Sequence, residues 1–308
     1  MLTSFFGKSN PVNYLILGIF IGLGYIIAIF TGPPIEFSLQ NIVAYIFGLG
    51  LCVFTMLLVD FIIRKNDLTK PNTFGILFFS CFLIMLPIIF FDRNILLSNA
   101  FLLLALRRIL SLKSEKNPEK KVLDASLWIS IAAFFYVYSL LFFAVLFLAI
   151  LRKKHTTYKH LLIPFVGFFG VFAIATAYNY VVFGSFNWFF EFDALINFDF
   201  SAYNSVALLI PLTILVTLII WTSIHRLYKL ASVAKKDRPN YLLMLIITAA
   251  AVLMVLASPQ RTGAELLFLV SPLAIIAANY VESISEFWFK EVLLWLVVLL
   301  PGILFFLR

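Results

Sequence analysis

The sequence predicts an all-α protein, a polytopic bundle of helices that crosses a membrane many times. Hydrophobic residues make up 63% of the chain and charged residues only 12%, and the mean hydropathy is +1.05. Such a composition excludes a water-soluble fold and indicates that the lipid bilayer is the solvent. One threading of the apolar segments also places all 23 Lys and Arg residues on a single side, except Arg93, Arg261 and Arg308. The positive-inside rule makes that side cytoplasmic and puts the N-terminus inside.

Four spans are predicted in the first part of the chain, at residues 12–30, 41–63, 73–91 and 95–112. The first must stop before Pro33 and Pro34, because two prolines cannot continue a helix. The second and the fourth return to basic residues on the inner side. Arg107 and Arg108 fall in the last turns of the fourth span, where long side chains can reach the headgroups.

The apolar block 125–151 has basic residues at both of its ends. A single crossing would leave one of these clusters outside, against the positive-inside rule. Two short helices that turn near residues 136–139 would keep both clusters inside, and we therefore expect a hairpin here, with one crossing as the alternative. The tip should be covered by protein or lie near the outer surface, because lipid cannot satisfy the free backbone groups of a turn.

Five more spans are predicted after this block, at residues 161–183, 206–224, 241–257, 266–280 and 292–307. With the hairpin counted as two, the chain makes about eleven crossings and forms one membrane domain over residues 1–308. The outer loop 185–204 is rich in aromatic residues, chiefly Phe, and we expect it to lie along the membrane surface.

Chemistry at the outer face has to come from few polar side chains. Glu36 and Asp92 are the candidate catalytic carboxylates, since each lies in an outer loop and could act as a general base. Arg261 is the candidate phosphate ligand, because an Arg at the outer boundary is unusual and its planar fork suits a phosphate. Arg93 and Glu265 complete the candidate substrate-binding set.

A structural interpretation of the same residues is the alternative. Arg261 and Glu265 are one helical turn apart and could pair only to close their loop. Asp92 and Arg93 could likewise neutralise each other in a turn, and a single Glu36 in a polar loop could simply be solvated.

Several classes of function lack the residues that they need. No phosphate-binding loop, dinucleotide-binding loop or metalloprotease helix occurs in the sequence, so we expect no cofactor. The three His residues have no Cys or carboxylate at metal-ligand spacing, so we expect no metal. The basic residues lie in short loops beside the spans, which argues against a nucleic-acid partner and leaves membrane lipid as the expected one.

Three segments carry a resemblance to known proteins: residues 1–11 (MLTSFFGKSNP), the hairpin block from Asp124 to Arg152, and the stretch from Arg261 to Glu282. Together they resemble an uncharacterised family of multi-pass inner-membrane proteins from Bacteroidota, which implies a location in the cell inner membrane. In architecture the chain is also similar to polytopic glycosyltransferases that use polyprenyl-phosphate sugars. That similarity implies sugar transfer at the outer face, with polyprenyl phosphate as the lipid. Those enzymes carry an acidic residue in a sizeable first outer loop, whereas here Glu36 lies in a short one.

Two hypotheses about function follow. An enzyme of the glycosyltransferase type should have a cavity open to lipid on the outer side, with Glu36 or Asp92 as the base and Arg261 on the phosphate. A non-catalytic subunit or scaffold of a cell-envelope complex should lack that cavity and should have a protein partner. A secondary transporter would need charged sites at mid-membrane and internal repeats, which the sequence does not show clearly.

Overall fold

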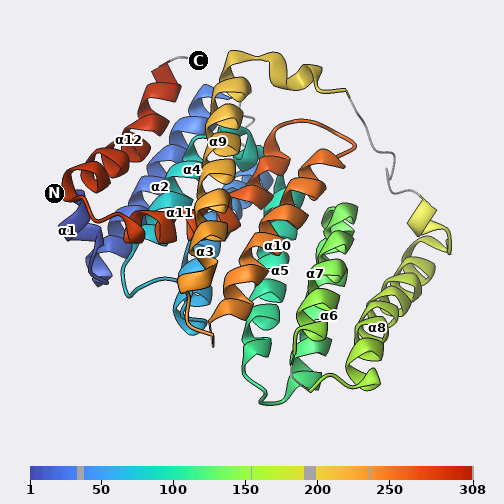
Figure 1. Cartoon of the computed structure of the whole chain (residues 1–308). Helices are drawn as coiled ribbons and strands as arrows, with labels where there is room; N and C mark the ends of the chain where they lie inside the picture. The colour runs from blue at the N-terminus through green and yellow to red at the C-terminus, as the bar shows by residue number, and fades with distance from the viewer. Residues whose placement is uncertain (33–37, 154, 191–198, 236, 307–308) are drawn as a thin grey trace.

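The computed structural model describes residues 1–32, 38–153, 155–190, 199–235 and 237–306. Every regular element within them is helical, so the predicted all-α class is confirmed. In chain order the α-helices are α1 (Leu2–Phe6), α2 (Pro11–Thr31), α3 (Leu39–Lys65), α4 (Phe74–Ile84), α5 (Arg93–Leu110), α6 (Pro118–Phe135), α7 (Phe142–Leu151), α8 (Tyr158–Phe183), α9 (Val206–Lys229), α10 (Arg238–Leu256), α11 (Leu267–Ser283) and α12 (Phe287–Phe306) (Figure 1). Short 3-10 helices join some of them, including η1 (Pro87–Phe91), η3 (Val137–Leu141), η5 (Ser201–Asn204) and η7 (Ala264–Leu266).

Eight helical segments of the described chain are long and apolar enough to cross a membrane. They are α2, α3, α8, α10 and α12, together with Arg93–Lys113, Val206–Ser232 and Ala264–Ser283, in which an α-helix is joined to a 3-10 turn. Helix α4 and the stretch Val137–Leu151 are apolar but shorter. These lengths identify a multi-pass integral membrane protein. The count of about eleven crossings and the inner position of the N-terminus stay predictions.

The third predicted span is not a single helix. Helix α4 ends at Ile84, and the chain resumes as η1 at Pro87. Proline lacks the N–H that a continuous helix needs and disfavours the α conformation in the residue before it, which accounts for the break. Nearly all of α4 is buried. Its irregular end is therefore shielded by other helices rather than by lipid, as such a break requires.

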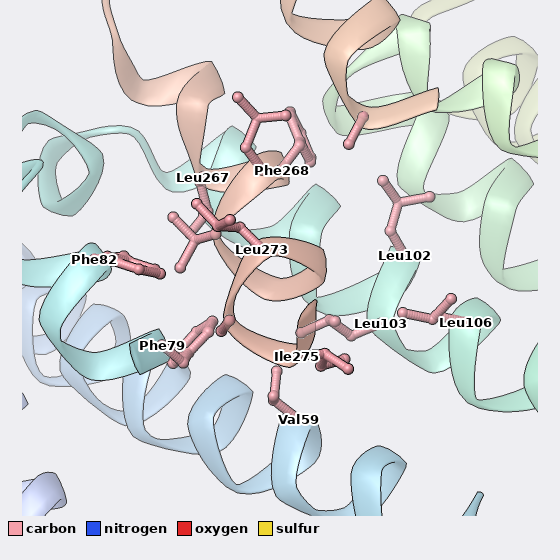
Figure 2. Packing of buried hydrophobic residues seen from close by; sticks show 14 of the residues in the cluster. Val59, Phe79, Phe82, Leu102, Leu103, Leu106, Leu267, Phe268, Leu273 and Ile275 are labelled. Carbon is pink, nitrogen blue, oxygen red and sulfur yellow. The ribbon is translucent and has the colours of Figure 1, made fainter. Parts of the chain in front are cut away.

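The centre of the bundle is formed by α4 and α11, which pack against each other and are buried along almost their whole lengths. Figure 2 shows part of this core, where Phe79 and Phe82 of α4 lie with Leu273 and Ile275 of α11. Val59 of α3 and leucines of α5 complete the cluster. At the periphery, α8 lies at the edge of the bundle beside α6 (Figure 1). Only 11% of its most apolar window is buried, so most of its surface is left for lipid.

The block 125–151 turns back on itself where the charge pattern predicted. Helix α6 ends at Phe135, and the chain runs through Tyr136 and η3 into α7. Lys121 near the start of α6 and Lys153 after α7 are close enough for their charges to repel. The hairpin therefore begins and ends on the same side of the bundle. The arms are unequal, because α6 has 18 residues and α7 only 10.

The tip of this hairpin is covered by protein, as expected. Ser98 of α5 donates a hydrogen bond to the Ala132 carbonyl at 3.1 Å, and its hydroxyl lies 2.8 Å from that of Ser139. Tyr136 donates to the Met254 carbonyl of α10 at 3.0 Å. The polar groups of the turn thus find partners on two neighbouring helices, which lipid could not supply.

The charged residues divide the bundle into two ends. We call the end that carries Arg64, Lys113 and Lys121 the basic end; there Lys113 pairs with Asp237 at 2.7 Å and Arg108 with Asp124 at 2.7 Å. Arg93 and Arg261 lie at the opposite end, as the charge pattern predicted, while Arg308 is outside the described residues. The predicted surface segment 185–204 lies partly outside them too, and its described parts include two short 3-10 helices.

Candidate functional site

A polar cleft lies at the opposite end of the bundle, between the start of α5, the hairpin turn and the loop 257–263 that follows α10. It consists of two adjoining hollows of about 190 Å³ and about 430 Å³. Both hollows are lined by Asp92, Asn94 and Thr262. The smaller hollow is lined further by Ile95, Phe134, Phe135, Tyr136, Val137, Tyr138, Ser258, Pro259 and Gln260, and the larger by Ile88, Phe91, Arg93 and Ala264.

Asp92 is fixed by its place at the N-cap of α5. One carboxylate oxygen, Oδ1, accepts a hydrogen bond from the backbone N–H of Ile95 at 3.0 Å. A carboxylate at this position satisfies a free N–H of the first turn and complements the helix dipole. Within the described chain, Oδ2 makes no hydrogen bond. The residue is half-buried and one of its oxygens is available to a ligand in the cleft.

Arg93 and Asn94 follow at the first turn of α5, and both are exposed. Arg93 lines the larger hollow and forms neither an ion pair nor a hydrogen bond with any other described residue. It therefore presents an uncommitted guanidinium at the mouth of the cleft, next in sequence to the Asp92 carboxylate. The structure brings these two predicted site residues together.

Arg261 lies in the loop 257–263, which forms one wall of the cleft, but its side chain faces away from the cleft. Its side chain is enclosed, with 6% of the residue exposed. The guanidinium carbon lies 3.8 Å from the centre of the Phe200 ring, and Nη2 donates to the Leu256 carbonyl at 2.8 Å. Arg261 lines neither hollow, and these contacts tie its loop to the end of α10 and to the segment before α9.

Glu265 is completely buried at the start of η7. Its Oε2 accepts hydrogen bonds from the Gly263 N–H at 2.9 Å and from the Thr262 hydroxyl at 3.3 Å, and its Oε1 accepts one from the Tyr203 hydroxyl. Burial, and then the Glu265 charge, raises the pKa of Tyr203 well above its usual value, so the phenol is a donor at neutral pH. Gly263 has φ +94°, and a Cβ there would approach Leu208 to 2.7 Å. The turn therefore requires glycine.

The five predicted site residues thus have different places. Asp92 and Arg93 line the cleft, Arg261 and Glu265 hold the loop that forms its wall, and Glu36 lies outside the described residues. Sequence analysis missed Asn94, Tyr136 and Gln260 as lining residues. The polar Tyr136 and Ser139 inside an apolar block were the available signal, since a buried polar group must have a partner.

Comparison with known protein families places the chain in one of them. The model described as "Family of unknown function (DUF6427)" matches residues 1–308. The chain belongs to the DUF6427 family. The expected membership of an uncharacterised family is therefore confirmed over the whole chain. No curated protein and no solved structure matches this DUF6427 chain.

An apolar groove lies near the cleft of this DUF6427 protein, between α2, α4 and α12. It measures about 250 Å³, and its outer rim includes the exposed side chains of Leu23 and Ile27. Gly302 leaves open space on the α12 side, because nothing lies within 4 Å of where its Cβ would be. The groove is lined by Phe20, Leu23, Gly24, Ile27, Ala28, Thr31, Ile84, Met85, Pro87, Pro301, Gly302, Leu304, Phe305 and Phe306.

The groove and the cleft of the DUF6427 fold share the short helix η1. Pro87 lines the groove, whereas Ile88 and Phe91 line the larger hollow of the cleft. A 3-10 helix rises about 2.0 Å per residue, so the five residues of η1 extend over roughly 10 Å. The apolar groove and the polar cleft therefore lie within about 10 Å of each other. No group of His, Cys, Asp and Glu in the described residues could hold a metal ion.

Proposed function

We propose that this protein binds a polyprenyl-phosphate-linked sugar at the end of the bundle opposite the basic end and transfers the sugar to an acceptor. The observation that carries the proposal is the pairing of an apolar groove with a polar cleft across η1. A polyprenyl phosphate has the matching parts, because its chain is apolar and its head carries a negative charge. The apolar side chains around the groove suit an isoprenoid chain that enters from the bilayer.

Arg93 is the residue that holds the phosphate in this proposal. It lines the cleft and its guanidinium is not committed to another described residue. A guanidinium offers a planar fork of donors that matches phosphate oxygens. Arg261, which the sequence favoured for this role, instead positions the loop that carries Ser258, Gln260 and Thr262.

Asp92 is the residue that removes the proton. In the proposed step the acceptor hydroxyl attacks the anomeric carbon of the sugar, and its proton passes to the Asp92 carboxylate. The bond between the anomeric carbon and the phosphate oxygen breaks, and its electron pair leaves with the polyprenyl phosphate. Arg93 stabilises the negative charge that develops on that leaving group.

Retention of lipid by the purified protein tests the binding half of the proposal. Wild type purified from native membrane in mild detergent should carry a polyprenyl phosphate that mass spectrometry detects, and Arg93→Ala should lose it. Arg152→Ala is the matched control, because Arg152 is an exposed arginine at the basic end. Ordinary phospholipid alone in the wild type, or equal retention by both variants, would count against the proposal.

The groove is tested separately by filling it. Gly302→Leu adds a side chain where open space lines the groove, whereas Gly18→Leu adds the same side chain to open space on α2 outside the groove. The proposal expects Gly302→Leu to reduce the retained polyprenyl phosphate and Gly18→Leu to leave it unchanged. Equal retention by the two leucine variants would show that the lipid chain lies elsewhere.

A non-catalytic subunit of a cell-envelope complex is the second candidate. The observation in its favour is that Arg261 and Glu265 are enclosed by their own surroundings, as structural residues would be. This candidate predicts a stoichiometric protein partner after gentle purification, together with no retained polyprenyl phosphate. The lipid measurement above separates the two candidates.

A further inference from the structure

A second polar cavity lies at the basic end, on the other side of the bundle from the proposed reaction. It measures about 230 Å³ and is formed by the end of α9, the start of α10, the end of α11 and the residue Lys70 after α3. A water molecule occupies only about 30 Å³ in the liquid, so the cavity can hold a group several times larger. Neither the groove nor the cleft shares a lining residue with it.

Arg226 forms the floor of this cavity, with only 2% of the residue exposed. Its Nε donates to the Tyr241 carbonyl at 3.0 Å, its Nη1 donates to the Asn279 side-chain oxygen, and its guanidinium lies 3.7 Å from the centre of the Tyr241 ring. Asn279 is held in turn by a 2.8 Å hydrogen bond to the Leu68 carbonyl. Three chain segments therefore fix the guanidinium in place. Its third nitrogen, Nη2, makes no hydrogen bond to the described residues and is the donor left for a ligand.

The charges around the cavity favour an anion. Lys70, Arg226 and Lys229 line it and carry three positive charges, against the single carboxylate of Glu282. One oxygen of that carboxylate, Oε1, already accepts hydrogen bonds from the Lys70 N–H at 3.0 Å and from the Asn72 amide at 2.5 Å. The Lys229 ammonium pairs with no described residue. A buried, oriented guanidinium beside uncommitted lysines is the donor set that binds phosphate groups.

The position of the cavity favours a lipid headgroup as the source of a phosphate. Trp221 is 59% exposed on the flank of α9, and its ring meets that of Tyr280 edge to face at 6.2 Å. Trp and Tyr gather at the membrane interface, and basic pockets between helices on the cytoplasmic side bind anionic lipid headgroups. We propose that this cavity is a binding site for a phosphate-bearing anion, supplied by the headgroup of an anionic phospholipid.

The test measures the thermal unfolding midpoint of the delipidated full-length protein in detergent. The protein is titrated with phosphatidylglycerol, with phosphatidylcholine of the same acyl chains, and with inorganic phosphate. Lys229→Gln removes a lining charge at the end of α9, and Lys235→Gln removes one from the following loop, outside the cavity. A lysine near an anionic surface contributes about 1 kcal/mol, so Lys229→Gln should raise the half-saturating phosphatidylglycerol concentration about fivefold. Lys235→Gln should leave it nearly unchanged.

The outcomes separate the possible sources. Stabilisation by phosphatidylglycerol over phosphatidylcholine, weakened in Lys229→Gln alone, supports the lipid site. Stabilisation by inorganic phosphate with the same weakening supports the site with a soluble ligand. Equal weakening in both variants reflects general surface charge and overturns the proposal, as does an absence of stabilisation by either probe. Retention of polyprenyl phosphate, which tests the opposite end, should not change in Lys229→Gln.

Discussion

The hydrogen bond between Tyr203 and Glu265 offers a direct test of how the wall of the cleft is held. Both residues are enclosed, with 5% and 0% exposed, and 62 positions in sequence separate them. A hydrogen bond to a charged group contributes about 1.5–3 kcal/mol, and burial keeps water from replacing it. The singly changed proteins Tyr203→Phe and Glu265→Gln should therefore each be destabilised.

A double-mutant cycle isolates the contact itself. The coupling energy should be about 1–2 kcal/mol, because Glu265→Gln keeps a neutral acceptor and removes only the charge-assisted part of the bond. The Gly263 and Thr262 bonds to Glu265 are unchanged by Tyr203→Phe. The ion pair of Lys113 and Asp237 is the matched control, since both side chains are about one-third exposed. Exposed pairs of this kind contribute about 0.2–1 kcal/mol.

Reversible unfolding in mixed micelles supplies the free energies, with the denaturing detergent titrated and helix content followed by circular dichroism. Every variant should reach the same unfolded baseline, so that the four free energies of each cycle can be compared. A coupling within about 0.5 kcal/mol of zero would mean that the two residues act independently. That result would refute the interpretation that Tyr203 anchors the loop through Glu265.

Two further predictions concern buried polar groups. The first concerns Tyr203, whose pKa is raised above its unfolded value of about 10. The contribution of Tyr203 to stability is therefore complete below pH 10 and is lost as the pH rises further. The stability difference between wild type and Tyr203→Phe should shrink from pH 9 to pH 11, and a constant difference would contradict this. Ser98→Ala removes a donor from the hairpin turn and leaves Ser139 without this partner, so unfolding should become easier by about 1–3 kcal/mol. Ser80→Ala is its control, because Ser80 is equally buried but bonds only within its own helix, and an equal cost in both variants would argue against a special role for the turn.

The sequence was sufficient to predict the helical class, the approximate spans and the two ends of the bundle. Charge placement located the hairpin turn, because lysines beside apolar spans report which ends share a side. Hydropathy could not tell which helices are central. The segment Ala264–Ser283, which contains α11, and helix α8 are similarly apolar, yet 89% of the most apolar part of the first and 11% of that of the second is buried. Lipid and protein interior are equally apolar, so composition does not distinguish them.

The candidate site was predictable only in part, for a related reason. That Arg261 lies at the end opposite the basic loops followed from its neighbours in sequence. The direction of its side chain did not, because it depends on Phe200 and Leu256, which reach the guanidinium through the fold. The role of Asp92 as an N-cap, by contrast, is local, and the first turn of a helix regularly requires such a residue.

The contrast between Arg261 and Arg93 shows how the cleft could keep its shape while exchanging ligands. A charge at the membrane boundary is expensive unless protein groups replace its water, and the contacts of Arg261 supply that replacement. Enclosure of Arg261 and Glu265 therefore fixes the loop that forms one wall, whether or not a substrate is bound. Arg93 has no such enclosure and is exposed, so in the proposed mechanism it stays hydrated until an anion arrives. A preorganised wall beside an uncommitted cation limits the ordering cost of binding to one side chain, which would suit repeated binding and release of the charged lipid that we propose as the ligand.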